Sequence, residues 1–402
     1  MPEFTLDMYQ TAGVAMLLFV LGRFLTTRIE FLKRCCIPAP VVGGLIFAIV
    51  HLVLYSCGVV QLSFDDNVKS FFMTLFFTSV GYTACFRLLK KGGKKVFTFL
   101  IIAIVMVCLQ DVVGAALAKV FGWDMRLGLC TGSIPMVGGH GTAGSYGPLM
   151  ENKLGIAGAN VLAIAAATYG LVAGNVIGNP LARRRIKKLG LSSSDAAQVD
   201  HEALLELKKN TEGTAKLDVD RGTLALALIF LACGPGTLIS MLFDKFNITL
   251  ASYVGSMIIG IIIRNAICDK FDLDLPVQEI ETIGSISLNF FLALAMMGMQ
   301  LWQLADLAGP MVAILLIQTV LTGLFVYFVT FNMMGRDYDA AVLSAGHCGF
   351  GMGATPNAMA NMDALTKVFG PSEKAYLIIP VCGGFFTDIV NSLILTFFMN
   401  VL

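Results

Sequence analysis

Charged residues are scarce in this chain. Only 14% of its 402 residues are charged, whereas 56% are hydrophobic and the mean hydropathy is +0.78. A water-soluble chain of this length needs more charge to cover its surface, so a lipid bilayer must be the solvent for much of it. The net charge of +1 also excludes the strongly basic surface that is typical of nucleic-acid-binding proteins.

Catalytic and metal-binding signatures are missing as well. The sequence has no Ser/His/Asp arrangement, no H-E-x-x-H and no phosphate-binding loop, which argues against hydrolysis and against ATP as an energy source. Its ten cysteines contain no C-x-x-C pair, and most lie in apolar runs where a thiol packs as a small hydrophobe. We therefore predict reduced, structural cysteines, no cofactor, and a protein that is not an enzyme.

What the sequence does have is long apolar runs, of about 20 residues each, which is the length a helix needs to cross the hydrocarbon core. We predict transmembrane helices at 8–27, 40–60, 69–88, 96–119, 158–182, 222–243, 248–266, 283–303, 309–333 and 374–400. Two further stretches, 127–150 and 340–362, are apolar but rich in glycine, serine, threonine and proline. Neither resembles a plain lipid-facing helix.

The distribution of lysine and arginine indicates the orientation, because cytoplasmic loops carry an excess of both. If the N-terminus is outside and both glycine-rich stretches enter and leave by the same face, almost all of the 28 basic residues are cytoplasmic. The exceptions are Lys69, Lys119, Arg126, Lys153 and Lys245. A full crossing by either stretch would invert every later loop and destroy this bias. We therefore predict a re-entrant hairpin at 127–150 from the outside and one at 340–362 from the cytoplasm.

The two halves of the chain resemble each other. The matching blocks pair 71–89 with 290–308, 125–144 with 338–357, and 168–182 with 381–395. Each half has an odd number of crossings, so the second must be inverted relative to the first, which is an architecture of secondary transporters. The sequence thus predicts an all-α membrane protein of ten transmembrane helices in two inverted five-helix repeats, 1–183 and 222–402, each with one re-entrant hairpin. A cytoplasmic linker, 184–221, joins them.

The predicted hairpins are suited to binding ions. Their glycines and prolines break regular helix and leave backbone groups unpaired, which costs several kcal/mol per group in hydrocarbon unless the backbone lies in protein or beside a polar cavity. Freed N–H groups and helix N-termini attract anions, whereas freed carbonyls suit Na⁺. Close helix packing by small residues is the alternative explanation. The match between two hairpins favours a binding site.

Polar side chains inside the predicted spans are further candidates. Asp388 lies near the middle of the last span, where an ionised carboxylate costs roughly 2.5–3.5 kcal/mol or more unless a cation or a substrate ammonium offsets it. The repeat relates Asp388 to Asn175, whose amide supplies a neutral oxygen. Gln110 and Asp111 in the fourth span and Gln318 in the ninth form a second polar set. Interhelical hydrogen bonding without a ligand is the alternative for all of them.

Several segments closely resemble the bacterial sodium/glutamate symporter family. They are PAPVVGGL (38–45), GGHGTAG (138–144), FFLALAMMGMQLWQLADLA (290–308), YDAAVLSAGHCGFGMGATPNAMANM (338–362), FGPSEKAYL (369–377) and DIVNSL (388–393). The likeness covers essentially the whole chain. It implies a homodimeric carrier of the bacterial inner membrane with both termini periplasmic, L-glutamate as substrate, Na⁺ as coupling ion, and elevator-like movement of one domain against another.

With this resemblance the candidate residues take roles. The hairpins are predicted to bind the carboxylates of glutamate through Ser133, Gly139, His140, Gly141, Thr142, Gly351, Gly353, Ala354, Thr355 and Asn357. The predicted sodium ligands are Asp388, Asn175, Asn391, Gln110 and Gln318. A sodium-coupled symporter of another small carboxylate is the neighbouring alternative, and an ion channel with re-entrant loops is the alternative from a different class.

Overall fold

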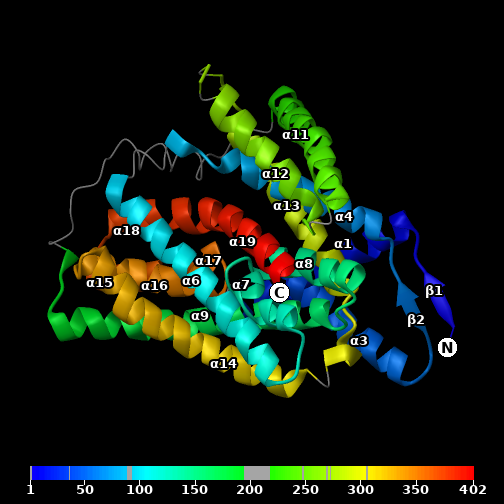
Figure 1. The fold of residues 1–402 in the computed structure, drawn as a ribbon, viewed down its shortest axis with the longest axis horizontal. Coiled ribbons are helices and arrows are strands. Elements are labelled where there is room, and N and C mark those ends of the chain that lie inside the picture. The colour runs from blue at the N-terminus through cyan, green and yellow to red at the C-terminus, as the bar shows by residue number, and fades with distance from the viewer. Residues whose placement is uncertain are drawn as a thin grey trace.

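The structure is a computed structural model that describes residues 2–35, 37–87, 93–193, 218–246, 249–268, 270–271, 273–304 and 307–402. Within these ranges it is almost entirely helical (Figure 1). The exceptions are two short strands near the N-terminus, β1 (Glu3–Thr5) and β2 (Gln61–Ser63), which pair in parallel.

A helix lies at each of the ten predicted crossings. Seven are long and apolar enough to span a membrane, namely α1 (Met8–Arg28), α3 (Ala39–Ser56), α6 (Gly93–Val120), α9 (Ala159–Leu189), Val219–Phe243 within α11 (Val219–Lys245), α13 (Val277–Met297) and the continuous helix Ala308–Met334. This last helix comprises α14 (Ala308–Phe325), η5 (Val326–Thr330) and α15 (Phe331–Met334). The other three runs correspond to α4 (Asp66–Thr83) and to the shorter apolar helices Tyr253–Cys268 and Thr387–Val401.

The helices pack into two groups, each of which draws on both halves of the chain (Figure 1). The first group contains α1, α3, α4, α11, α12 (Ser252–Ile262) and α13. The second contains α6, α9, α14, the two glycine-rich segments, and the last helical stretch, which runs through α18 (Glu373–Val381), η6 (Cys382–Phe386) and α19 (Thr387–Val401). The helices of the first three predicted crossings in each half therefore separate from the later helices of that half.

Each glycine-rich segment forms two helical arms joined by a short break. Residues 127–150 lie within a segment formed by η1 (Met125–Thr131), α7 (Ser133–Met136) and α8 (Gly139–Leu154). Residues 340–362 lie within α16 (Tyr338–Met352) and α17 (Thr355–Phe369). We call these segments hairpin 1 and hairpin 2, and their breaks at 137–138 and 353–354 the tips.

The two hairpins begin in the same way. Asp124 caps η1 by accepting a hydrogen bond from the backbone N–H of Arg126, and Asp337 caps α16 by accepting one from that of Ala340. Two residues earlier, Gly122 (φ 77°) and Gly335 (φ 125°) adopt backbone conformations that favour glycine. Asp124 and Asp337 are as far apart in the sequence as Asn175 and Asp388, and so are Gly122 and Gly335. The capping aspartate and the glycine turn therefore recur at equivalent positions of the two halves.

Two helices extend into the predicted linker, 184–221. The helix α9 continues to Leu189, past the predicted start of the linker at residue 184, and α11 begins at Val219. Lysine and arginine are good helix formers, so the basic stretch that ends the apolar run prolongs the helix. Residues 194–217 of the linker lie outside the described part of the chain.

Small residues let α1 and α3 approach very closely. A Cβ atom added to Gly22 would lie 1.9 Å from the carbonyl oxygen of Ala39, and one added to Gly43 would lie 1.8 Å from that of Leu18. These contacts are to backbone, which cannot swing away as a flexible side chain would. The packing of the two helices therefore depends on both glycines.

We expect Gly22→Ala to lower the stability of the protein in detergent. Separating the two backbones to make room for the methyl group should cost about 1–3 kcal/mol, which a lower Tm in thermal unfolding would report. The matched control is Gly13→Ala in the same helix, where an added Cβ meets no atom within 4 Å. That variant should be neutral or slightly stabilising because alanine favours helix, and equal Tm values for the two variants would contradict the prediction.

Candidate functional site

A cavity of 280 Å³ lies where the two hairpin tips meet the first helix group. Its walls come from hairpin 1, hairpin 2, α4, α13 and the last helical stretch, and include Phe76, Phe77, Gly138–Thr142, Leu288, Leu292, Gly353–Pro356, Gly383 and Asp388. The start of α8 lies against the tip of hairpin 2, because a Cβ added to Gly139 (φ 56°) would lie only 2.8 Å from the carbonyl oxygen of Gly353. Residues more than two hundred positions apart thus form one wall.

Two helix N-termini point at this cavity. The helix α8 begins after Gly138 and α17 after Ala354, and neither residue offers a side chain that could cap the helix. The first N–H groups of a helix have no partner within it, and they carry a partial positive charge. Because both helix starts line the cavity, the N–H groups at the start of α8 and that of Thr355 in α17 are available to an anion inside it. Pro356 has no N–H, and that of Asn357 donates to the Ala354 carbonyl (3.0 Å).

The carboxyl group of Asp388 lines the same cavity. It projects from the first turn of α19, and among the described residues its carboxylate makes no hydrogen bond or ion pair. A carboxylate in a largely apolar pocket is costly unless a positive charge joins it. The cavity therefore presents one negative group and two positive helix ends.

A second polar feature, the Asp111 cluster (Asp111, Ser133 and Asn391), lies outside this cavity. The backbone N–H of Ser133 donates to Asp111 Oδ1 (2.8 Å), and Ser133 Oγ lies 2.9 Å from Asp111 Oδ2 and 2.6 Å from Asn391 Oδ1. Asp111 is 0% exposed, and no basic side chain of the described residues pairs with it. A hydroxyl has only one proton and cannot donate to both oxygens, so a cation among these oxygens would relieve the conflict.

A third feature, the Gln110 cluster (Gln110, Gln318 and the carbonyl of Gly351), lies on another side of α6. Gln110 Nε2 donates to the Gly351 carbonyl (2.8 Å), and Gln318 Nε2 donates to the Gln110 carbonyl (2.8 Å). The side-chain oxygens of both glutamines are buried and have no hydrogen-bond partner among the described residues. Buried acceptors without a donor are rare and costly, and they are suitable ligands for a hard cation.

The cavity gathers most of the predicted substrate residues. Those that line it are Gly139, His140, Gly141, Thr142, Gly353, Ala354 and Thr355. Of the remaining three, Ser133 belongs to the Asp111 cluster and Gly351 to the Gln110 cluster, while Asn357 donates through Nδ2 to the carbonyl of Leu171 (2.8 Å) and keeps a buried oxygen without a partner in the described part of the chain. His140 Nε2 lies 3.0 Å from Thr168 Oγ1, so the hairpin histidine also braces hairpin 1 against α9.

The predicted sodium ligands are divided among these features. Asn391 lies in the Asp111 cluster, Gln110 and Gln318 form the Gln110 cluster, and Asp388 lines the cavity. The amide of Asn175 donates to the carbonyl of Leu171 in its own helix (3.2 Å), the one contact of its side chain within the described residues.

Two sets of residues in these features have no role in the prediction from sequence. Asp111 was predicted to be one of a polar set but not a ligand, although an aspartate in the middle of an apolar span is the same signal that identified Asp388. Nor does the prediction include the apolar wall contributed by Phe76, Phe77, Leu288 and Leu292. These residues resemble ordinary core positions, so no local pattern distinguishes them.

Comparison with known proteins identifies a family for this chain. The family described as "Sodium/glutamate symporter" matches residues 4–371. The sodium/glutamate symporter of Escherichia coli (strain K12) is 38% identical over 399 residues, which cover 98% of both chains. That of Haemophilus influenzae is 39% identical over 396 residues, covering 98% of this chain and 97% of the relative. Among solved structures, a sodium proton antiporter from Methanocaldococcus jannaschii matches with a TM-score of 0.41 and 15% identity, over 97% of this chain and 96% of the other.

Three observations lead to one assignment. They are the helices long enough to span a membrane, the resemblance of the sequence segments to the family, and the full-length matches to two relatives. The chain is a multi-pass membrane protein and belongs to the sodium/glutamate symporter family.

Proposed function

We propose that the protein imports L-glutamate by symport with Na⁺ across the bacterial inner membrane. The observation that carries this proposal is the cavity in which two uncapped helix N-termini face one unpaired carboxylate. An amino-dicarboxylate has the complementary charges, two negative and one positive. The names of the relatives support the same substrate and the same coupling ion.

In this proposal the two carboxylates of glutamate bind at the two hairpin tips. One accepts hydrogen bonds from the N–H groups at the start of α8 and from Thr142, and the other binds at the start of α17 beside Thr355. The ammonium group faces Asp388. The apolar wall from α4 and α13, with Phe76 and Leu288, covers the aliphatic part of the substrate and excludes water.

Sodium binds in the clusters on α6. The carboxylate of Asp111 supplies the charge, Ser133 and Asn391 supply neutral oxygens, and the free oxygens of Gln110 and Gln318 offer a second position. The sequence grouped Asp388 and Asn175 with these ligands. The position of Asp388 in the cavity favours the substrate ammonium, and the role of Asn175 stays a prediction.

The clusters provide a physical link between ion and substrate. Ser133 lies in α7, directly before the tip of hairpin 1, and Asn391 lies one turn after Asp388 on α19. An ion that orders Ser133 and Asn391 therefore also positions the tip and the carboxylate that receive glutamate. Each Na⁺ that moves inward gains about 2.3 kcal/mol per 100 mV of membrane potential, besides its concentration gradient.

The architecture we propose is two inverted five-helix repeats with re-entrant hairpins, assembled as a homodimer with both termini periplasmic. The recurrence of the cap and turn at the start of each hairpin supports the repeat. The cavity lies at the boundary between the two helix groups, so we propose that the second group carries the substrate past the first in an elevator-like movement.

Reconstituted vesicles would test this function. We expect labelled L-glutamate to accumulate only under an inward Na⁺ gradient, with saturation and with competition by unlabelled glutamate. Stronger competition by citrate or another carboxylate would instead favour a symporter of that carboxylate. A substrate-independent current that does not saturate would favour an ion channel.

A further inference from the structure

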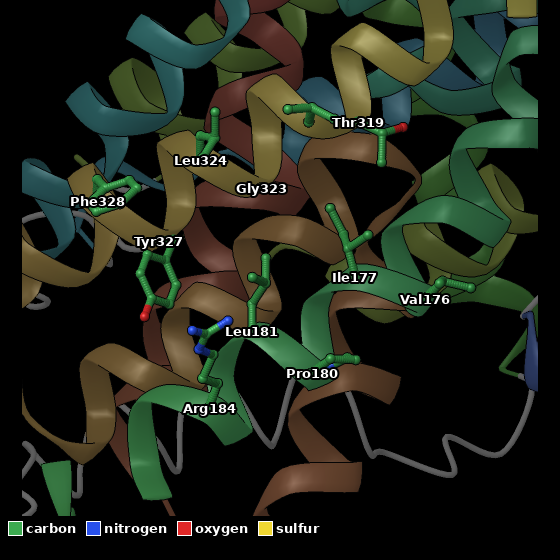
Figure 2. Close-up of a pocket in the computed structure, with 11 residues that line it drawn as sticks. Val176, Ile177, Pro180, Leu181, Arg184, Thr319, Gly323, Leu324, Tyr327 and Phe328 are labelled. Atoms are coloured by element: carbon green, nitrogen blue, oxygen red, sulfur yellow. The ribbon is translucent and has the colours of Figure 1, made fainter. Parts of the chain in front are cut away.

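An apolar groove of 570 Å³ lies between α9 and the continuous helix α14–η5, away from the substrate cavity. Its lining is aliphatic and aromatic along most of its length, with Val176, Ile177 and Leu181 from one helix and Leu324 and Phe328 from the other (Figure 2). Val320 also lines it. Val176, Val320, Leu324 and Phe328 are each more than half exposed, at 62%, 60%, 54% and 56%. In a membrane-spanning helix pair such a groove opens onto lipid.

One end of the groove carries a positive charge. Figure 2 shows the guanidinium of Arg184 above its own helix, beside Leu181 and below Tyr327. Within the described residues Arg184 has no hydrogen bond or ion pair, unlike its neighbour. Arg185 donates to the Tyr327 carbonyl (2.8 Å) and stacks 3.7 Å from the centre of the Tyr327 ring. The charge of Arg184 is therefore available to a ligand from outside the protein.

The groove has the length and the position in the membrane that one acyl chain of a lipid requires. Arg184 follows the apolar part of α9 in a basic stretch that also contains Arg183 and Lys187, where a helix leaves the hydrocarbon. From Arg184 to Val176 the helix rises about 12 Å, at about 1.5 Å per residue. This is close to the thickness of one leaflet's hydrocarbon, which is about 15 Å.

We propose that this groove binds a phospholipid with an anionic headgroup, its phosphodiester on Arg184 and one acyl chain along the apolar lining. Charge complementarity selects this occupant, because a neutral tail would not need a free guanidinium at the interface and a free anion would not need the groove. With both termini periplasmic, the lipid comes from the cytoplasmic leaflet. The proposal does not depend on the identity of the transported substrate.

Native mass spectrometry of the full-length protein in detergent would test the site with phosphatidylglycerol and phosphatidylethanolamine as probes. We expect the protein to retain phosphatidylglycerol in preference, and Arg184→Gln to weaken its binding about fivefold, as for the loss of one basic residue at an anionic membrane surface. Arg183→Gln removes the same charge one position away, outside the groove lining, and should leave binding unchanged.

A second variant tests the apolar part. An added Cβ at Gly323 would lie 3.6 Å from Leu181 Cδ1 and 3.8 Å from Ile177 Cδ1, which are ordinary contacts, so Gly323→Leu should fill the groove without displacing backbone. It should reduce retention of both lipids. Equal effects of Arg184→Gln and Arg183→Gln, or equal retention of the two lipids by the unaltered protein, would overturn the proposal. So would conversion of a dimer to a monomer by Gly323→Leu without loss of lipid, because the groove would then be a contact between chains.

Discussion

Asp388→Asn is expected to raise the KM for L-glutamate at least thirtyfold in reconstituted vesicles. Removal of one partner of a buried charge pair costs about 2–5 kcal/mol, and the cavity offers no second carboxylate among its described lining residues to receive the substrate ammonium. Asparagine has nearly the same shape, so the hairpin tips and the apolar wall should keep their positions. The loss should therefore appear in substrate binding and not in folding, which an unchanged Tm without substrate would verify.

The role of Asp388 can be separated from that of a sodium ligand. If the carboxylate faces the ammonium, glutarate, which lacks the amino group, should compete poorly with glutamate in the unaltered protein. In Asp388→Asn it should compete almost as well as glutamate, while the Na⁺ concentration that gives half-maximal uptake at saturating glutamate stays the same. A large change in that Na⁺ concentration would return Asp388 to the ion site, where the sequence pattern places it.

A surface aspartate provides the control for charge. Asp274 is paired with Arg221 and its side chain is 81% exposed, so Asp274→Asn removes one negative charge outside the lining of the substrate cavity. We expect normal KM values for both glutamate and Na⁺ in that variant. Full Na⁺-dependent uptake by Asp388→Asn would contradict both roles, because neither the substrate nor the ion would then need the carboxylate in the cavity.

The sequence predicted those features of the protein that the surrounding solvent, hydrocarbon or water, determines. Ten apolar runs became helices, and the two stretches in which glycine, serine and threonine interrupt the apolar pattern became two-armed segments. Hydrocarbon allows few backbone solutions, so composition along the chain is unusually informative in a membrane protein. The helix α9 continues to Leu189, beyond the predicted crossing at 158–182, because its last residues are basic and hydropathy does not detect a helix that continues into water.

The parts that sequence could not supply are those in which distant residues converge. Ser133 reads locally as a hairpin residue, and only the fold brings its hydroxyl to Asp111 and Asn391. Likewise Phe76 and Leu288 are ordinary members of apolar helices until the tips close the cavity against them. A site built between two halves of a chain depends on packing angles, which no periodicity specifies.

Asp111→Asn is the second substitution with a large expected effect, and it should act first on the binding of Na⁺ and on glutamate only through the loss of that ion. The side chain is 0% exposed and accepts two hydrogen bonds from Ser133, so its charge is compensated by neutral donors only, as far as the described residues extend. In a water-excluded site the attraction between a carboxylate and Na⁺ is much stronger than in water. We expect the half-maximal Na⁺ concentration for uptake to rise about tenfold or more, which corresponds to roughly 1.4 kcal/mol or more.

Thermal unfolding distinguishes this role from a structural one. A ligand that binds only the folded state raises the Tm, so Na⁺ should stabilise the unaltered protein, whereas it should have little effect on Asp111→Asn. In the absence of Na⁺ the variant should be as stable as the parent or more so, because it no longer buries an unpaired charge. A purely structural aspartate would give the opposite pattern, with a lower Tm in Na⁺-free buffer and an undiminished response to Na⁺.

The neighbouring glutamine separates the two positions on α6. Gln110 Nε2 contacts hairpin 2 at Gly351, whereas Asp111 contacts hairpin 1 through Ser133. If both clusters bind Na⁺, uptake by Gln110→Leu should depend less steeply on Na⁺ concentration. Na⁺ should still raise the Tm of this variant, since the charged position at Asp111 remains. Because one ion position touches each hairpin, loss of either should leave one tip unordered, and the cavity would then hold glutamate by a single helix N-terminus.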